Sequence, residues 1–410
     1  MSAETRDRET EYTGAEQGET PQWPHLTLVT QDEGEAPFGA DPRSVGLVQT
    51  QILEVPGLFT LESGRSLDGL TIAYETYGTL NARRDNAILL CHALSGDAHA
   101  AGYHTPHDRR PGWWDTMVGP GKAFDTSRYF VICSNVLGGC RGTTGPSSPN
   151  PLTGRPYATD FPLVTVGDMV EVQRLLLDTL GIERLAAVAG GSMGGMQVLH
   201  WAVHHPARIA RAIVLASCVR LTAQALAFNE VGRQAIMGDP RWRGGRYPAD
   251  DPPVGGLAAA RMIGHLTYLS AVGMEQRFGR SLQDREAITY SFEADFQVES
   301  YLRHQGTSFV QRFDANSYLY ISRAMDYFDL SRGFDGLAAA LDRSSAEFLL
   351  VSIDTDWLYP TSQAREIYDA LVETGRSPRH VEISSPHGHD AFLIEHATIT
   401  PHIVAFLDGT

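Results

Sequence analysis

The chain has 410 residues, of which 42% are hydrophobic and 20% charged, a composition typical of a globular protein with a sizeable core. Its net charge of −16 repels phosphate backbones and argues against a nucleic-acid partner. The sequence contains neither a run of about 18 apolar residues nor a basic-then-apolar leader. We therefore expect no membrane partner and a cytoplasmic location.

The first 45 residues differ in composition from the rest of the chain. They contain ten acidic residues against three arginines and few apolar residues. Such a segment cannot bury enough surface to offset its chain entropy, so we predict that residues 1–45 form a disordered acidic tail.

Short apolar runs follow along the chain and predict a sheet. Residues 59–64 and 70–78 alternate apolar and polar side chains and end in Gly, a pattern typical of antiparallel edge strands. Continuous apolar runs of this length suit buried parallel strands. They occur at residues 86–91, 129–133, 185–189, 212–216 and 348–353.

Helical patterns lie between several of these runs, at residues 166–180 and 196–204 for example. This alternation predicts a mostly parallel, doubly wound α/β sheet that an antiparallel hairpin opens. The strand signal is absent from residues 218–333, where residues 221–237, 256–278 and 296–327 have helical patterns. We therefore expect a helical lid subdomain at 218–333, inserted in a core of residues 46–217 and 334–410.

The segment Gly190-Gly191-Ser192-Met193-Gly194 contains the clearest chemical motif. It has the form G-x-S-x-G and stands between an apolar strand and a helix, as the nucleophile elbow of an α/β hydrolase does. The motif alone occurs by chance in glycine-rich chains, and its position makes it informative. We predict that Ser192 is a nucleophile at a helix N-terminus.

In this fold the partners follow in the order Ser, acid, His. Two aspartates compete for the acid after the last apolar strand, and Asp356 is favoured over Asp354 because it stands four residues before Pro360. His389 is favoured over His387 as the base, because it follows a glycine and begins a helical stretch.

An oxyanion hole needs two amides, one from the residue after the nucleophile and one from the loop after the third strand. These are expected to come from Met193 and Leu94. A metal site at His92, Asp97 and His99 is the rival interpretation of that loop. It is disfavoured because no H-E-x-x-H pattern is present, and the four cysteines have no C-x-x-C spacing. We expect no metal and no cofactor.

Several segments together resemble the homoserine O-acetyltransferases of methionine biosynthesis, a branch of the α/β-hydrolase superfamily. The resemblance covers about residues 46–405. It is carried by residues 92–97, 112–115, 119–121, 135–146, 190–197, 260–268, 312–318, 352–360 and 388–393.

The resemblance implies that Ser192, Asp356 and His389 form the catalytic triad. It also implies that Arg261 grips the carboxylate of homoserine, with Tyr268 nearby, and that Asp390 receives its ammonium group. A zwitterionic substrate needs one cation and one anion, and the planar fork of an arginine suits a carboxylate. Family members dimerise through the cap, which implies a homodimer.

The implied activity is ping-pong transfer of an acetyl group from acetyl-CoA, as co-substrate, to the hydroxyl of L-homoserine. Succinyl transfer stays open because Arg141 offers a further cation near the elbow, and serine stays open as a shorter acceptor. An esterase would use the same triad. A catalytically silent interaction protein is disfavoured because all three triad positions are occupied.

Overall fold

The computed structural model of the chain describes residues 38, 39 and 41–410. Most of the predicted acidic tail therefore lies outside the described residues. The main sheet contains β1 (Gln51–Thr60), β2 (Ser66–Tyr77), β3 (Ala87–Cys91), β6 (Phe130–Ser134), β7 (Ala187–Gly191), β8 (Arg211–Leu215), β9 (Glu347–Ile353) and β10 (Arg379–Ile383). The short strands β4 (Val118–Gly119) and β5 (Phe124–Asp125) form a separate pair.

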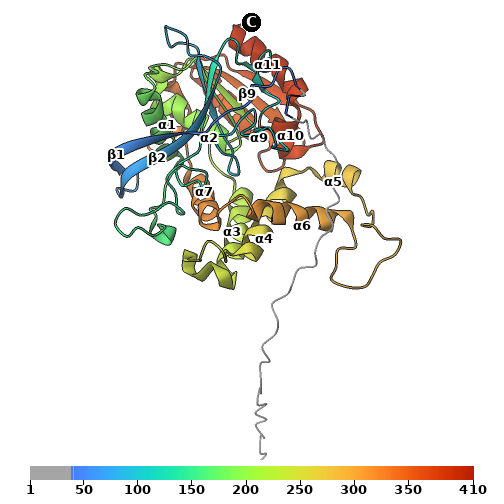
Figure 1. Cartoon of the computed structure of the whole chain (residues 1–410). Helices are drawn as coiled ribbons and strands as arrows, with labels where there is room; N and C mark the ends of the chain where they lie inside the picture. The colour runs from blue at the N-terminus through green and yellow to red at the C-terminus, as the bar shows by residue number, and fades with distance from the viewer. Residues whose placement is uncertain (1–37, 40) are drawn as a thin grey trace, which may run out of the picture. The chain divides into compact units, whose positions relative to one another are not determined.

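The eight-stranded sheet has the order β1-β2-β6-β3-β7-β8-β9-β10 (Figure 1). β1 pairs antiparallel with β2 and β2 with β6, and every later pair is parallel. The fold class predicted from the sequence is therefore confirmed. Strand β10 was not predicted, because its segment Arg379–Ile383 alternates polar and apolar residues at the sheet edge and lacks an apolar run.

Among the described residues, six helices outside the insertion alternate with or follow the strands along the chain. They are α1 (Val166–Thr179), α2 (Met193–His204), α8 (Gly336–Asp342), α9 (Thr361–Glu373), α10 (Ala391–Ile394) and α11 (His396–Asp408). The insertion between β8 and β9 contains the helices α3 (Ala223–Met237), α4 (Val254–Tyr268), α5 (Ala271–Arg277), α6 (Gln297–Val310) and α7 (Ala315–Tyr327). Helices α3, α4, α6 and α7 lie together below the sheet in Figure 1.

Two segments that the periodicity predicted as continuous helices are each broken in two. Ser270 ends the first, because its hydroxyl accepts a hydrogen bond of 2.8 Å from the amide of Gly273 and so caps α5. Asp314 ends the second, because its carboxylate accepts a bond of 2.7 Å from the amide of Ser317 and caps α7. Serine and aspartate compete with the helical backbone in this way and favour N-caps.

The end of the predicted tail packs on the core. The carboxylate of Asp41 lies 3.1 Å from the ammonium group of Lys122, whose side chain is buried and also lies 3.0 Å from Asp115. A buried lysine needs carboxylate partners, and Asp41 supplies one of them from within the predicted tail.

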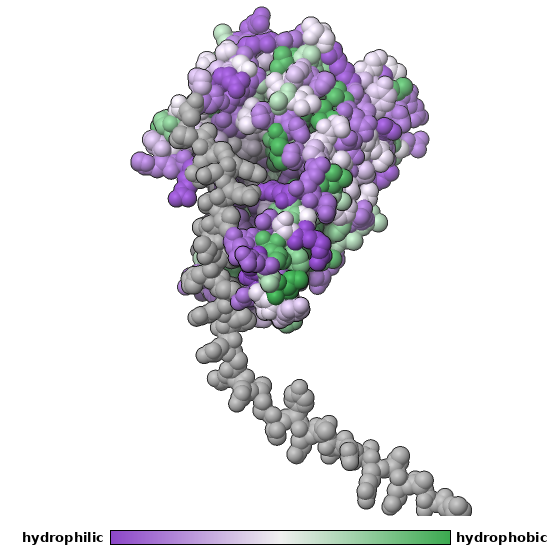
Figure 2. All heavy atoms as spheres, turned by 90° about the vertical axis from the view of Figure 1, so that its right-hand side faces the viewer, coloured by the Kyte–Doolittle hydropathy of each residue, from purple (hydrophilic) through white to green (hydrophobic). Residues whose placement is uncertain are grey.

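On the face that Figure 2 shows, hydrophobic residues lie in small groups among hydrophilic ones. Among the described residues, several large apolar side chains of the insertion are exposed: Leu226, Val231, Leu266, Val272, Ile288, Tyr290, Phe292 and Tyr327. No helix of the described chain is long and apolar enough to cross a membrane.

Candidate active site

Ser192 occupies a strained turn between β7 and α2. Its backbone has φ 56° and ψ −125°, a conformation that L-residues rarely adopt. The glycines on either side allow the turn to approach β3. A Cβ atom added to Gly190 would lie 2.7 Å from the carbonyl oxygen of Cys91, and one added to Gly194 would lie 2.0 Å from it. The G-x-S-x-G pattern is therefore a requirement of packing at this turn.

His389 and Asp356 form a buried pair. Nδ1 of His389 lies 2.7 Å from Oδ2 of Asp356. The second oxygen, Oδ1, accepts hydrogen bonds of 3.0 Å and 2.8 Å from the backbone amides of Leu358 and Tyr359. The loop after β9 thus holds the carboxylate, and the carboxylate holds the imidazole so that Nε2 is the nitrogen available for proton transfer.

Asp354, the rival acid, has different partners. Its carboxylate accepts hydrogen bonds from the hydroxyl of Ser384, at 2.7 Å, and from the amide of Ser385, at 3.1 Å. It thereby ties the end of β9 to the end of β10 and does not contact His389. His387 lies 3.9 Å from Glu395 with a half-exposed side chain, apart from the Asp356 pair.

The loop before His389 packs closely against the end of α4. Gly388 has φ +63°, and an added Cβ atom would lie 2.6 Å from the amide nitrogen of Ser270 and 2.8 Å from the carbonyl oxygen of Tyr268. Only glycine fits this contact. The insertion therefore helps to position His389, and it also contributes residues to the cavity in front of Ser192.

Tyr359 belongs to the site although the sequence analysis did not single it out. Its ring stacks on the imidazole of His389, with ring centroids 4.9 Å apart and an interplanar angle of 26°. Tyr359 lines the same cavity as Ser192, and burial raises the pKa of Tyr359 well above its ordinary value. The position of Pro360 predicted that this loop carries the acid, but no sequence pattern predicted a role for Tyr359.

The two residues predicted for the oxyanion hole flank Ser192. Met193 is the first residue of α2, and Leu94 lines the cavity in front of the serine. His92 holds the loop that carries Leu94. Its Nδ1 bonds the carbonyl oxygen of Ala93 at 2.7 Å, and its Nε2 accepts the amide of Val136 at 3.1 Å. The backbone thus occupies both ring nitrogens, so His92 is unsuited to bind a metal.

Arg261 and Tyr268 lie on the same helix, α4, with the guanidinium carbon of Arg261 5.5 Å from the centre of the Tyr268 ring. The guanidinium also lies 4.7 Å from the ring centre of Phe309 and donates a hydrogen bond of 3.4 Å to the Ser95 hydroxyl. Within the described part of the chain, Arg261 has no carboxylate in ion-pair contact. Its charge is therefore available to an anionic ligand.

Asp390 provides a negative group beside this cation. Burial raises the pKa of Asp390 to about 6, while the neighbouring positive charges of His389 and Arg261 act in the opposite direction. No described residue hydrogen bonds or ion pairs with its carboxylate. A cation without a carboxylate partner and a carboxylate without a hydrogen-bond partner thus lie within electrostatic range of each other, an arrangement that suits a zwitterion.

Arg312 is a second cation, and it lies in one of the segments that resemble the homoserine O-acetyltransferases. Its guanidinium carbon lies 5.2 Å from the ring centre of Phe309, and its Nη1 donates a bond of 2.8 Å to the carbonyl oxygen of Ser95. Desolvation and the charge of Arg261 lower the pKa of Arg312 to about 10. Arg141, which the sequence analysis considered for this role, lies 3.9 Å from Asp97 and already has a carboxylate partner.

A cavity in front of Ser192 encloses about 500 Å³ of empty space, part of it open to solvent. None of the described residues that line it is charged. They are Leu94, Ser192, Leu221, Ala225, Phe228, Asn229, Ile263, Gly264, Thr267, Tyr268, Tyr318, Met325, Leu358 and Tyr359.

The strand order, the elbow and the Asp356–His389 pair define an α/β hydrolase, and a family model described as the alpha/beta hydrolase fold matches residues 86–396. The chain is 56% identical to a homoserine O-acetyltransferase of Methanosphaerula palustris, over 90% of this chain and 74% of that protein. It is 54% identical to a homoserine O-succinyltransferase of Magnetococcus marinus, over 89% and 95%. The chain belongs to the homoserine O-acyltransferase family within the α/β-hydrolase fold.

Solved structures agree with this assignment. The homoserine O-acetyltransferase of Bacillus anthracis is 34% identical and superposes with a TM-score of 0.83, over 88% of this chain and 98% of that one. Esterase E22 is 32% identical, with a TM-score of 0.82 over 88% and 100%. The same architecture thus occurs in a protein named as a transferase and in one named as an esterase, so the acceptor site has to distinguish the two reactions.

Proposed function

We propose that this homoserine O-acyltransferase uses acetyl-CoA as its donor and forms O-acetylhomoserine. The observation that carries the proposal is the uncharged cavity in front of Ser192. An acetyl group has no charge to neutralise and suits this lining, whereas the carboxylate of a succinyl group would need a cation from outside the lining.

The first half-reaction acylates Ser192. Nε2 of His389, oriented by Asp356, takes the hydroxyl proton while the serine oxygen attacks the thioester carbonyl. The amides of Met193 and Leu94 stabilise the oxyanion. The carbon–sulfur bond then breaks, and the departing thiolate receives the proton from His389.

The second half-reaction delivers the acyl group to homoserine. Arg261 binds the carboxylate of the amino acid and Asp390 its ammonium group, which brings the side-chain hydroxyl toward the acyl-serine. His389 removes the hydroxyl proton and the homoserine oxygen attacks the acyl carbon. The ester bond to the Ser192 oxygen then breaks, and that oxygen receives the proton from His389. A helical lid that excludes water limits the competing hydrolysis.

A second candidate donor is succinyl-CoA, and Arg312 is the observation that favours it. Arg261 and Arg312 approach the same Phe309 ring, and neither has a carboxylate partner among the described residues. Two cations can bind two carboxylates, one from homoserine and one from the acyl group. Relatives named for acetyl and for succinyl transfer are equally similar to this chain, so the name of a relative does not decide the donor.

A donor and acceptor panel tests the proposal. Thiol release is measured with acetyl-CoA and succinyl-CoA, each with homoserine, serine or no acceptor. We expect acetyl-CoA with homoserine to have the largest kcat/KM. Mass spectrometry of enzyme mixed with acetyl-CoA alone should show one acetyl group on Ser192, and Ser192→Ala should show none and no turnover. A preference for succinyl-CoA that Arg312→Ala reverses would establish the second candidate instead.

We also propose a homodimer that forms through the insertion. The exposed apolar side chains of the segment between α5 and α6, Tyr290 and Phe292 among them, support this surface. Sedimentation should give twice the chain mass for the wild type and a weaker dimer for Phe292→Glu, whereas Leu152→Glu, at an exposed position outside the insertion, should not change it.

A further inference from the structure

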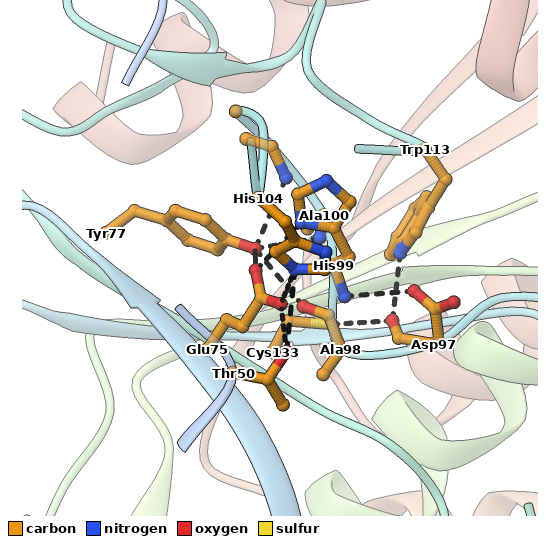
Figure 3. A network of polar contacts seen from close by, with 12 residues as sticks. Thr50, Glu75, Tyr77, Asp97, Ala98, His99, Ala100, His104, Trp113 and Cys133 are labelled. Carbon is orange, nitrogen blue, oxygen red and sulfur yellow. Dashed lines mark hydrogen bonds and ion pairs between the residues drawn. The ribbon is translucent and has the colours of Figure 1, made fainter. Parts of the chain in front are cut away.

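A carboxylate and two imidazoles meet at a place that the proposed reaction does not use. Glu75 lies on β2, and His99 and His104 lie on the loop that follows β3 (Figure 3). Oε2 of Glu75 lies 3.0 Å from Nδ1 of His99, and Oε1 lies 2.7 Å from Nε2 of His104. One donor atom from each of the three residues falls within 4.8 Å of the others.

Glu75 is fully buried, and a buried carboxylate requires a positive partner. The ion pairs that the structure gives it are with these two histidines, which carry charge only when protonated. Thr50 and Tyr77 add hydroxyl hydrogen bonds of 2.8 Å and 2.9 Å, which are neutral. A lysine or arginine partner for Glu75 is not found in the described part of the chain.

The two imidazoles cannot both supply this charge at low cost. Their ring centroids lie 3.9 Å apart at an interplanar angle of 34°, so two protonated rings would repel each other at contact distance. If both rings are neutral, the buried carboxylate has no cation among the described residues, and if one ring is protonated, the positive partner is a ring that solvent can reach. A single divalent ion in place of the shared proton would supply the positive charge without bringing two charged rings together.

We propose that Glu75, His99 and His104 bind one divalent ion of the zinc class and that the ion holds the loop after β3 on β2. Two imidazole nitrogens and a carboxylate are a donor set that Zn²⁺ prefers over Mg²⁺ or Ca²⁺. Thr50 and Tyr77 bond the remaining lone pairs of the carboxylate and so orient this ligand.

The surroundings suit a structural ion that solvent can reach. The Tyr77 hydroxyl also accepts the backbone amides of Ala100, at 2.7 Å, and Ala101, at 3.2 Å, so two further hydrogen bonds join the cluster to the loop. The His104 side chain is 43% exposed and that of His99 17%, which provides a path for the ion and room for a water ligand. Stabilisation of this loop would also steady Leu94, which lies earlier in it.

These ligands differ from the metal site considered from the sequence, which consisted of His92, Asp97 and His99. His92 is bound by the backbone, and Asp97 accepts the amide of His99 at 3.0 Å, so only His99 belongs to both sets. The glutamate stands 24 residues before one histidine and 29 before the other, on a different element, and no ligand motif has that form.

Calorimetric titration of untagged, chelator-treated full-length enzyme with ZnCl₂ tests the proposal, with MgCl₂ as the metal control. We expect one equivalent of zinc to bind with release of protons, and the thermal midpoint to rise by several degrees in zinc. His104→Ala and Glu75→Gln should weaken binding at least tenfold and abolish the rise. His107→Ala, an exposed neighbouring histidine outside the cluster, should behave as wild type.

Circular dichroism of the metal-free variants checks that they fold, and His104→Gln, which keeps a polar side chain, replaces His104→Ala if it does not. The proposal is overturned if the wild type binds no zinc. It is also overturned if folded His104 variants bind zinc as tightly as wild type, or if His107→Ala loses as much affinity as they do, because zinc would then bind elsewhere on the surface.

Discussion

Asp390 and Glu75 are both buried carboxylates, but their surroundings act in opposite directions. Burial raises the pKa of Asp390 to about 6, and no described residue bonds its carboxylate. Burial also acts to raise the pKa of Glu75, yet the hydrogen bonds from His99 and His104 outweigh it and hold the pKa at about 2. A carboxylate without protein partners is suited to receive a ligand, whereas one with four hydrogen bonds organises the fold around it.

Asp356 extends this comparison, because it has a fixed imidazole partner like Glu75 but lies beside Asp390. Asp356→Asn should lower kcat by about 10⁴, the order found when a serine triad loses its orienting acid. Asp354→Asn is the matched control and should cost at most a few-fold, because its partners are Ser384 and Ser385. Steady-state kinetics of both variants decide, and the reverse ranking would assign the role to Asp354.

The acceptor pair should show the next largest effect. Arg261→Ala should lower kcat/KM for homoserine by roughly thirty- to several-thousand-fold, the usual cost of removing one partner of a buried charge-assisted contact. It should leave thiol release without homoserine almost unchanged, because the thioester does not use this cation. Lysine at position 261 should restore only part of the loss, since it cannot present two parallel donors.

Pre-steady-state thiol release, compared with steady-state turnover, measures this separation. Asp390→Asn should also act mainly on homoserine, but less selectively, because it adjoins His389. If Arg261→Ala slows both half-reactions equally, the residue serves the thioester or the fold. Asp390 would then have no cationic partner in a site for homoserine.

The raised pKa of Asp390 predicts a pH dependence of acceptor binding. The carboxylate is ionised above about pH 6 and protonated below it, so kcat/KM for homoserine should fall about tenfold per pH unit below 6 on its account. The pH at which this fall begins depends on the charged groups that act on Asp390, which are His389, Arg261, Asp356 and His387.

Thiol release without homoserine serves as the control, because it shares the His389 requirement but not the Asp390 one. Asp390→Asn should reduce the difference between the two pH profiles. Identical acid limbs in both half-reactions of the wild type would show that Asp390 does not bind the substrate ammonium.

Glu75 should show its effect in stability. Its folded pKa lies below the ordinary value of 4.5, so its contribution is present above pH 4.5 and is lost as the pH falls from there toward 2. For metal-free enzyme at pH 7, Glu75→Gln should lower the thermal midpoint by a few degrees, as expected for a loss of about 2 kcal/mol in a chain of this size. The difference in thermal midpoint between this variant and wild type should shrink toward pH 3. If the difference stays constant with pH, the loss of stability comes from packing and not from the charge of Glu75.

The local patterns of the sequence were sufficient to predict the fold class and most of its strands. Apolar runs predicted the buried strands β3, β6, β7, β8 and β9, because a strand buried on both faces has no polar positions. The edge strand β10 was not predicted because half of its residues face solvent. The breaks at Ser270 and Asp314 were not predicted because helix periodicity continues across a capping residue.

What the sequence by itself determined was the alternation of strands and helices, the elbow at Ser192 and the chain order of its expected partners, since each depends on neighbouring residues or on one motif. Tertiary structure decided that His389 contacts Asp356 and not Asp354. It also brought Arg312 next to Arg261 and joined Glu75 to two histidines on another element. These contacts join residues far apart in the chain, and only the packing of strands and loops sets which side chains meet.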